Sequence, residues 1–315
     1  MEKMFLESII SSYFGNEKCI GIEKLSGGLT NFNYKIYMPK RREYFLKVFR
    51  NALPERVAAI AGLIKNIVDF HFPTPALILC ENDALFWESK SQSAIMTDFI
   101  KGHYPEKNLL NLYKIGTILG TLHQIPAKEK LIQGYSLNYS EQLNLMREAC
   151  IVLPDDLNQL LKHTDPILQN IPDGGFPQSI IHGDVFLDNL LLTDFEDIYF
   201  IDFEGGCIDK SIFDLARAVI GCTIEKGHIN LNLTGALING YNIARKLETK
   251  ECSFLYDYIL YAGTVSTIWR FIEFNIKRPN ENKSQLYQEL LQPTLNLLNL
   301  SKNKFNDHLY IKTDL

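Results

Sequence analysis

The 315-residue chain lacks the paired cysteine spacing that a zinc site or a disulfide framework requires. Its six cysteines are scattered, with no Cys-x-x-Cys pair and no histidine-rich spacing beside them. We therefore expect reduced, mostly buried thiols, as in a cytosolic protein. The six are Cys19, Cys80, Cys150, Cys207, Cys222 and Cys252.

Long apolar runs are missing as well. No stretch approaches the roughly 20 consecutive apolar residues that cross a bilayer as a helix. The N-terminus carries Glu2 and Glu7, whereas a signal peptide needs a basic start and a long apolar run. These absences predict a soluble, cytoplasmic protein with no membrane partner.

An excess of positive charge is the third absence. Lys and Arg number 32 against 37 for Asp and Glu, which gives a net charge of −5. Because nucleic-acid binding needs clustered positive charge, we expect no nucleic-acid partner. The dense basic run Lys40-Arg41-Arg42 lies between two strand-like segments and indicates a solvated hairpin turn.

The first hundred residues are predicted to be strands interrupted by one helix. Segments 32–37 and 44–49 alternate apolar and polar side chains, which is the strand period. After Leu53-Pro54, a proline suited to the first turn of a helix, apolar residues recur at helical spacing from 57 to 68. Segments 76–79 and 94–99 are again strand-like.

From residue 109 onward the pattern is mainly helical, beginning with an apolar stripe over 109–122. Further helices are expected near 140–149, 211–222, 234–246, 254–277 and 283–299, with a β-rich insert at 179–181, 190–192 and 198–201. The whole pattern predicts an α+β protein of two lobes. A small antiparallel-sheet lobe would cover 1–99 and a mainly helical lobe 100–315.

The strongest chemical signal is the run His-Gly-Asp-x-x-x-x-Asn at 182–189, followed by Ile-Asp-Phe-Glu at 201–204. Asp184 can accept a proton from a hydroxyl, and Asn189 and Asp202 offer the hard oxygen ligands that Mg²⁺ prefers. Phosphoryl transfer needs this kind of positioning and charge neutralisation. The alternative is that both aspartates are turn or cap residues at strand ends.

These runs resemble the aminoglycoside phosphotransferase and choline kinase superfamily, which has the protein-kinase-like fold. The resemblance covers nearly the whole chain and implies ATP, Mg²⁺ and a small alcohol as substrate. By position it implies Asp184 as catalytic base and Asn189 and Asp202 as metal ligands. Phe203-Glu204 departs from the Asp-Phe-Gly of protein kinases, which argues against an activation-loop switch.

Lys47 interrupts the strand at 44–49, and a buried lysine there must find negative charge. In kinases the corresponding lysine binds the α- and β-phosphates. The alternative is an edge-strand lysine that faces solvent. Glu55 is the candidate partner for Lys47, although it would equally suit the positive N-terminal end of the next helix.

The loop after the first strand contains two glycines that let the backbone approach a phosphate. It resembles the Gly-Gly-x-Thr-Asn loop of choline and homoserine kinases. The candidate nucleotide-binding residues there are Ser26, Gly27, Gly28, Thr30 and Asn31. An ordinary turn between strands is the alternative.

The segment that leaves the small lobe is expected to bind adenine through its backbone, at Asp98 and Ile100. Two further residues are expected to act as supports. His182 would brace the loop that carries the catalytic aspartate. Asp214 matches an acid that the superfamily uses to hold that loop.

Finer matches favour the bacterial homoserine kinases of this superfamily, among them the Leu-Pro helix start and the run Cys-x-Asp at 207–209. Homoserine needs a cation for its carboxylate and an acid for its ammonium. Arg270 is the candidate cation, with a surface ion pair as its alternative. Glu204, Asp209 and Glu273 are candidates for the acids that an aminoglycoside would require. Choline or ethanolamine kinase, aminoglycoside phosphotransferase and a nucleotide-binding pseudokinase remain alternative functions.

Overall fold

The structure is a computed structural model that describes residues 2–25, 31–50, 52–90, 92–128, 131, 134, 138–149 and 152–310. The chain forms two compact units. Unit 1 consists of Met1–His103, Ala127–Ile132 and Leu191–Glu204, and unit 2 of Tyr104–Pro126, Gln133–Leu190 and Gly205–Leu315. The predicted α+β class is confirmed, with an antiparallel sheet near the N-terminus and a helical C-terminal portion.

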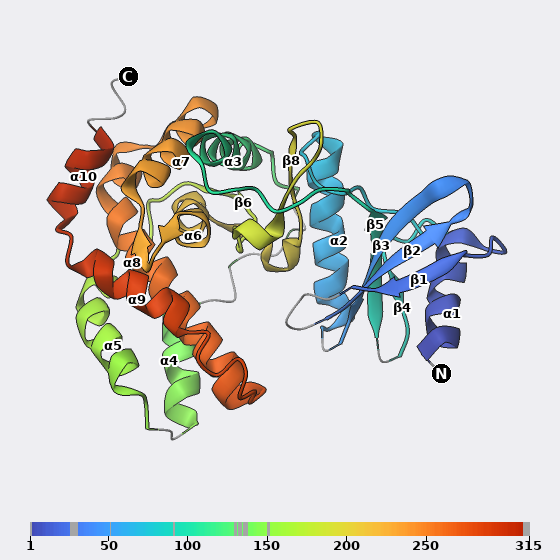
Figure 1. Ribbon diagram of the computed structural model, residues 1–315, viewed down its shortest axis with the longest axis horizontal. Coiled ribbons are helices and arrows are strands. Elements are labelled where there is room, and N and C mark those ends of the chain that lie inside the picture. The colour runs from blue at the N-terminus through green and yellow to red at the C-terminus, as the bar shows by residue number, and fades with distance from the viewer. Residues whose placement is uncertain are drawn as a thin grey trace. The chain divides into compact units, whose positions relative to one another are not determined.

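Unit 1 is built on a five-stranded antiparallel sheet of order β1-β2-β3-β5-β4 (Figure 1). β2 and β3 are joined by the predicted basic turn, where Lys40 and Arg41 both have φ of 60°. Left-handed backbone of this kind is typical of tight hairpins. The strands are β1 (Gly21–Lys24), β2 (Phe32–Met38), β3 (Arg42–Phe49), β4 (Trp87–Glu88) and β5 (Ser93–Asp98).

Two helices cover opposite sides of this sheet (Figure 1). α2 (Pro54–Asp69) begins at the predicted proline. α1 (Glu2–Phe14) was not predicted, so the expectation of a single helix in this region is wrong. Its apolar residues recur at helical spacing and join the core with strand residues such as Leu46. They are Leu6, Ile9, Ile10 and Tyr13.

The segment at 76–79, expected to be a strand, makes only an isolated bridge between Leu77 and Thr97. The backbone N–H of Ile78 also donates to the carbonyl of Met96, at 2.9 Å. The segment thus lies beside β5 without extending the sheet, because Pro73 and Pro75 interrupt the backbone donors just before it.

Unit 2 is mainly helical, and its closest helix pair is α3 with α7. A Cβ at Gly116 would lie 1.9 Å from the carbonyl oxygen of Leu237, and one at Gly240 would lie 1.9 Å from that of Tyr113. The helices, of which α5 and α10 were not predicted, are α3 (Leu109–Leu122), α4 (Tyr139–Glu148), α5 (Asp155–Leu168), α6 (Ser211–Cys222), α7 (Leu231–Ala244), α8 (Thr249–Phe271), α9 (Gln288–Leu298) and α10 (Lys302–Tyr310).

The predicted β-rich insert is present as short strands. β6 (Gln178–Ile181) pairs with β9 (Cys207–Lys210) in antiparallel register, and β7 (Leu190–Leu192) pairs with β8 (Ile198–Phe200). The chain leaves β6 into the loop 182–189, and it leaves β9 directly into α6. The run His-Gly-Asp-x-x-x-x-Asn at 182–189 therefore begins where β6 ends, and the helix that carries Asp214 begins where β9 ends.

Two expectations from the sequence concern the state of the cysteines and the absence of a membrane-spanning helix. The five cysteines that fall in the described ranges form no disulfide, and Cys80, Cys207 and Cys222 are buried. Cys150 lies outside the described residues. Within the described part of the chain, no helix has both the length and the apolar character needed to cross a membrane.

Candidate active site

The loop 182–189 is fixed by a buried carboxylate on α6. The Asp214 side chain accepts hydrogen bonds from the backbone N–H groups of His182 at 2.7 Å and Gly183 at 2.8 Å. Gly183 has a φ of 79°, a conformation that favours glycine. Burial alone would raise the pKa of Asp214, but hydrogen bonds and charge from His123 and His182 lower it below its usual value.

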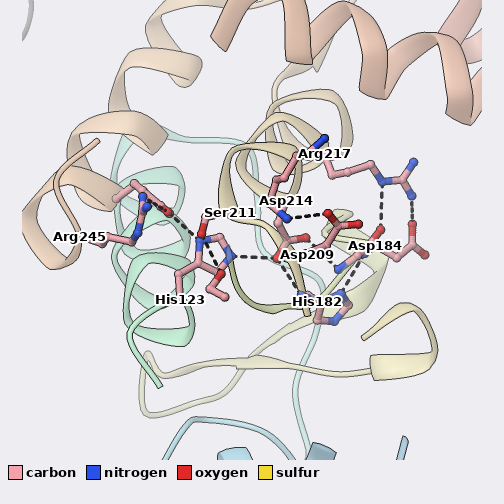
Figure 2. Close-up of polar contacts among 12 residues, drawn as sticks. His123, His182, Asp184, Asp209, Ser211, Asp214, Arg217 and Arg245 are labelled. Carbon is pink, nitrogen blue, oxygen red and sulfur yellow. Dashed lines mark hydrogen bonds and ion pairs between the residues drawn. The ribbon is translucent and has the colours of Figure 1, made fainter. Parts of the chain in front are cut away.

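The support continues away from the loop through a buried polar chain (Figure 2). His123, at the end of α3, contacts Asp214 through Nε2 at 3.1 Å and the Tyr241 hydroxyl through Nδ1 at 2.7 Å. Arg245 donates to the same hydroxyl at 2.9 Å and pairs with Glu251 at 3.1 Å. Helices α3, α7 and α8 are thereby all connected to the residue that holds the loop.

Asp184, the predicted base, lies within this loop with 44% of its side chain exposed. Asn189 Nδ2 donates to the Asp184 carboxylate at 3.0 Å and to its backbone carbonyl at 2.9 Å. The Asp184 N–H donates a hydrogen bond to His182 Nδ1 at 3.2 Å. The His182 ring therefore contacts the backbone of the loop.

Arg217 on α6 forms an ion pair with the Asp184 carboxylate, and the sequence analysis did not find it (Figure 2). Its Nε also donates to the carbonyl of Gly183 at 3.1 Å. The side chain is only 4% exposed. The signal that could have revealed it is an arginine in a helix that is apolar apart from Ser211 and Asp214, because a buried charge must find a partner.

In unit 1, Lys47 is neutralised by two carboxylates. Its Nζ lies 2.8 Å from Asp202 Oδ1 and 2.5 Å from Glu204 Oε1. Burial alone would lower the pKa of Lys47, but these two carboxylates raise it above its usual value. Lys47 pairs in register with Asn33 on one side and Ile95 on the other, so it is not an edge-strand lysine.

Glu204 is placed at Lys47, whereas the sequence analysis considered it for the acceptor. Its carboxylate also accepts a hydrogen bond from Asn31 Nδ2 at 2.7 Å, and its backbone carbonyl accepts one from Arg56. Burial and the charge of Asp202 raise the pKa of Glu204, although Lys47 and Asn31 oppose this shift. Asp202 itself has a φ of 65°, in the left-handed region that most residues avoid.

Of the two possibilities left open for Glu55, the structure shows the glutamate at the start of a helix and not a pair with Lys47. Glu55 is exposed in the first turn of α2, where its charge suits the helix dipole. Two residues that follow β8 supply the carboxylates instead. The physical reason is that Glu55 lies at the very start of its helix, away from the buried face that covers the sheet.

Of the five loop residues expected to bind the nucleotide, Asn31 lies within the described ranges. Ser26, Gly27, Gly28 and Thr30 lie outside the described residues. Asn31 Oδ1 accepts a hydrogen bond from the backbone N–H of Arg50 at 3.1 Å.

Asp98 and Ile100, which are expected to bind adenine through their backbone, lie at the end of β5 and just beyond it. The Asp98 N–H donates to Ala76, and its carbonyl accepts from Thr97 Oγ1 at 3.2 Å. Within the described ranges, the N–H of Ile100 has no hydrogen-bond partner, which leaves it able to bind a ligand. The two residues expected to bind adenine thus offer one free donor and one carbonyl with remaining capacity.

Asp209 and Arg270, two further candidates for binding the acceptor, lie in unit 2. Asp209 on β9 accepts a hydrogen bond from the backbone N–H of Lys210 at 2.7 Å. Arg270 on α8 pairs with Glu289 at 2.8 Å, which is the ion-pair alternative, and is 21% exposed. The Arg270 guanidinium also lies 5.9 Å from the centre of the Phe186 ring, in the loop that carries Asp184.

Asn189 and Asp202, the two residues predicted to bind a metal, each carry an oxygen of the kind that a hard cation accepts. Across the described ranges, no group of three or more His, Cys, Asp or Glu side chains is placed to hold a metal. Asn189 uses its amide nitrogen on Asp184, so its amide oxygen is left for a ligand. An amide oxygen is a donor that Mg²⁺ accepts, and so is a carboxylate such as that of Asp202 in unit 1.

Comparison with known proteins shows which family the chain resembles in sequence. A model of the phosphotransferase enzyme family, APH, matches residues 21–247. The homoserine kinase of Nitrobacter hamburgensis is 24% identical over 233 residues, which is 72% of this chain and 71% of that protein.

Solved structures show the same kinase-like fold. An amicoumacin kinase in complex with AMP-PNP, Ca²⁺ and Ami superposes with a TM-score of 0.74 at 14% identity, over 94% of this chain and 93% of the other. A microcompartment-associated aminopropanol kinase gives a TM-score of 0.71 at 15% identity, over 98% of both chains. At these identities the likeness concerns the fold alone.

Proposed function

Because the chain belongs to the phosphotransferase enzyme family, whose members are ATP-dependent small-molecule phosphotransferases, we propose that it phosphorylates the hydroxyl of homoserine or a similar amino alcohol. The observation that carries the proposal is the fixed pair of Asp184 and Asn189 in the loop after β6. A half-exposed carboxylate on a rigid backbone is suited to receive a proton from a bound hydroxyl.

The reaction divides among the residues described above. Asp184 accepts the proton of the acceptor hydroxyl as that oxygen bonds to the γ-phosphorus and the bond from this phosphorus to the β-γ bridging oxygen breaks, which releases ADP. Lys47 binds the α- and β-phosphates through its positive charge. Asn189 and Asp202 would hold Mg²⁺, which when bound neutralises the charge of the phosphates.

Homoserine is favoured over the other alcohols by the sequence likeness and by the charges available in unit 2. Its carboxylate needs a cation, for which Arg270 is the candidate, and its ammonium needs an acid, for which Asp209 is the candidate. Choline, ethanolamine and aminoglycosides are the competing acceptors. A pseudokinase is disfavoured because Lys47, Asp184 and Asn189 are all present together with Asp202.

The test is a coupled assay of ADP release with Mg²⁺ and ATP, run against homoserine, choline, ethanolamine and an aminoglycoside panel. We expect turnover with homoserine, lowered at least about 1,000-fold in Asp184→Asn, because the amide cannot accept the proton. ATP affinity should change little in this variant, as measured by calorimetry.

The outcome that contradicts the catalytic assignment is equal turnover by Asp184→Asn and the unaltered protein. Turnover with choline or an aminoglycoside alone would move the acceptor to that class and leave the phosphotransfer proposal in place. ATP binding without turnover of any alcohol would favour the pseudokinase.

A further inference from the structure

All three nitrogens of the Arg217 guanidinium donate hydrogen bonds, two of them to the catalytic loop. One terminal nitrogen pairs with Asp184 Oδ1, and Nε donates to the backbone carbonyl of Gly183 at 3.1 Å. The other terminal nitrogen donates to the hydroxyl of Ser266 on α8. The guanidinium carbon also lies 4.9 Å from the centre of the Phe186 ring.

Arg217 contacts a side chain of the loop, whereas Asp214 contacts and fixes the backbone of the loop. On the loop, Asp214 contacts the backbone N–H groups of His182 and Gly183, whereas Arg217 contacts the carboxylate of the proposed base. Together with Asn189, Arg217 fixes both oxygens of Asp184 and therefore the plane of its carboxylate. A forked guanidinium suits this task better than a single ammonium would.

Ser266 connects this arrangement to α8. Ser266 and Arg270 are four residues apart and so lie on one face of that helix. Both arginines also contact Phe186, with Arg270 at 5.9 Å from the ring centre. The base is thus connected through Arg217 to the helix face that carries the candidate partner of an acceptor carboxylate.

We infer that Arg217 is a positioning residue, which holds the Asp184 carboxylate in one orientation and couples that orientation to α8. The inference rests on the proposed function in one respect only, namely that Asp184 is the base. Losing the orientation should slow the transfer step and leave nucleotide binding intact, because the described contacts of Arg217 are with the catalytic loop and Ser266, all within unit 2. A misplacement of about 1 Å at a reacting group can cost on the order of 100-fold in rate.

The experiment compares Arg217→Gln, Arg217→Lys and Ser266→Ala with a matched control, Lys302→Gln. Lys302 also pairs with a carboxylate on α8, Asp257, but makes no contact with the loop. In Arg217→Gln we expect kcat to fall about 10- to 100-fold, with KM for ATP within about twofold. Arg217→Lys should fall in between, Ser266→Ala should lose only a few-fold, and Lys302→Gln should keep its kcat.

Two further readouts separate positioning from a general structural role. In Arg217→Ala, added guanidinium at concentrations well below those that unfold the protein should restore part of kcat, and ammonium should restore less. A crystal structure of Arg217→Gln should show the Asp184 carboxylate turned from its present plane, with the loop backbone still held by Asp214. If Arg217→Gln does not fold, Ser266→Ala carries the same comparison, because it removes a support of Arg217 and keeps the charge.

The inference is overturned if Asp184 keeps its plane in Arg217→Gln, or if kcat falls no further than in Lys302→Gln. A rise in KM for ATP with unchanged kcat would also overturn it. The crystal structure decides even if the unaltered protein phosphorylates none of the alcohols. That result would reject the proposed function without bearing on the position of Asp184.

Discussion

Glu204 occupies the place at Lys47 that the sequence analysis gave to a glutamate on the neighbouring helix. Its carboxylate binds Lys47 and Asn31, and its backbone binds Arg56, so the segment after β8 is held at three points. A lysine neutralised by two carboxylates keeps its charge in spite of burial. We expect Glu204 to keep Lys47 extended for the phosphates of a nucleotide.

Replacing Glu204 with Gln tests this role, because the amide removes the charge and keeps an oxygen for Asn31. We expect the free energy of unfolding to fall by about 1.5–3 kcal/mol, the range for hydrogen bonds to charged groups, and KM for ATP to rise several-fold. Denaturant unfolding and initial rates measure the two effects. Glu55→Gln is the control, and equal effects in both variants would contradict the role of Glu204.

The difference between found and missed site residues follows from sequence distance. Asp184 and Asn189 lie five residues apart in one run, which short-range pattern can detect. Arg217 is 33 residues from Asp184 and 49 from Ser266, and Glu204 is 157 from Lys47. Such partners depend on how strands and helices come together, so a local pattern can mark a charge that needs a partner but does not identify the partner.

Among the elements, those with a clear period and a clear boundary were the ones predicted. α2 begins at Pro54 and α6 spans the predicted 211–222, because an apolar face and a defined start coincide. α5 was missed although it has apolar residues at helical spacing, since Pro166 lies inside it. Segment 76–79 has strand-like residues, but one bridge to β5 is all that its position allows.

The contact between α3 and α7 depends on two glycines whose missing side chains let the backbones meet. Gly240→Ala would place a Cβ 1.9 Å from the carbonyl oxygen of Tyr113, so the helices must separate. We expect a loss of at least about 1–3 kcal/mol in the free energy of unfolding, the usual cost of overpacking. Denaturant unfolding measures it.

Gly62 in α2 supplies the matched control for this prediction. A Cβ there meets nothing within 4 Å, so Gly62→Ala should be neutral or stabilise by up to about 1 kcal/mol through helix propensity. A Gly240→Ala variant as stable as the unaltered protein would show that the two helices can move apart at no cost.

For the molecule as a whole, Asp214 makes the free energy of unfolding depend on pH. The pKa of Asp214 is lowered on folding, so its stabilisation is fully present above the ordinary carboxyl pKa of about 4 and is lost as pH falls below that value. Asp214→Asn should be less stable at pH 7, by about 3 kcal/mol, because the amide cannot satisfy two backbone N–H groups. It should also lose less stability on acidification.

Unfolding midpoints in denaturant, measured for both proteins between about pH 3 and pH 7, check this prediction. Parallel curves for the two proteins would contradict it, because the acid-dependent part would then belong to other carboxylates. The comparison also measures how much Asp214 stabilises the loop 182–189, because Asp214 accepts hydrogen bonds from the first two backbone N–H groups of that loop.

Unit 1 is discontinuous in the chain, and this affects the order in which the protein can fold during synthesis. Residues 191–204 complete it, with Phe200 against Phe72 at 5.6 Å and with both carboxylates that neutralise Lys47. A fragment that ends at residue 103 would bury an ammonium group in a central strand without a counter-charge. On the ribosome, the N-terminal sheet therefore reaches its final form only after about a hundred further residues have emerged.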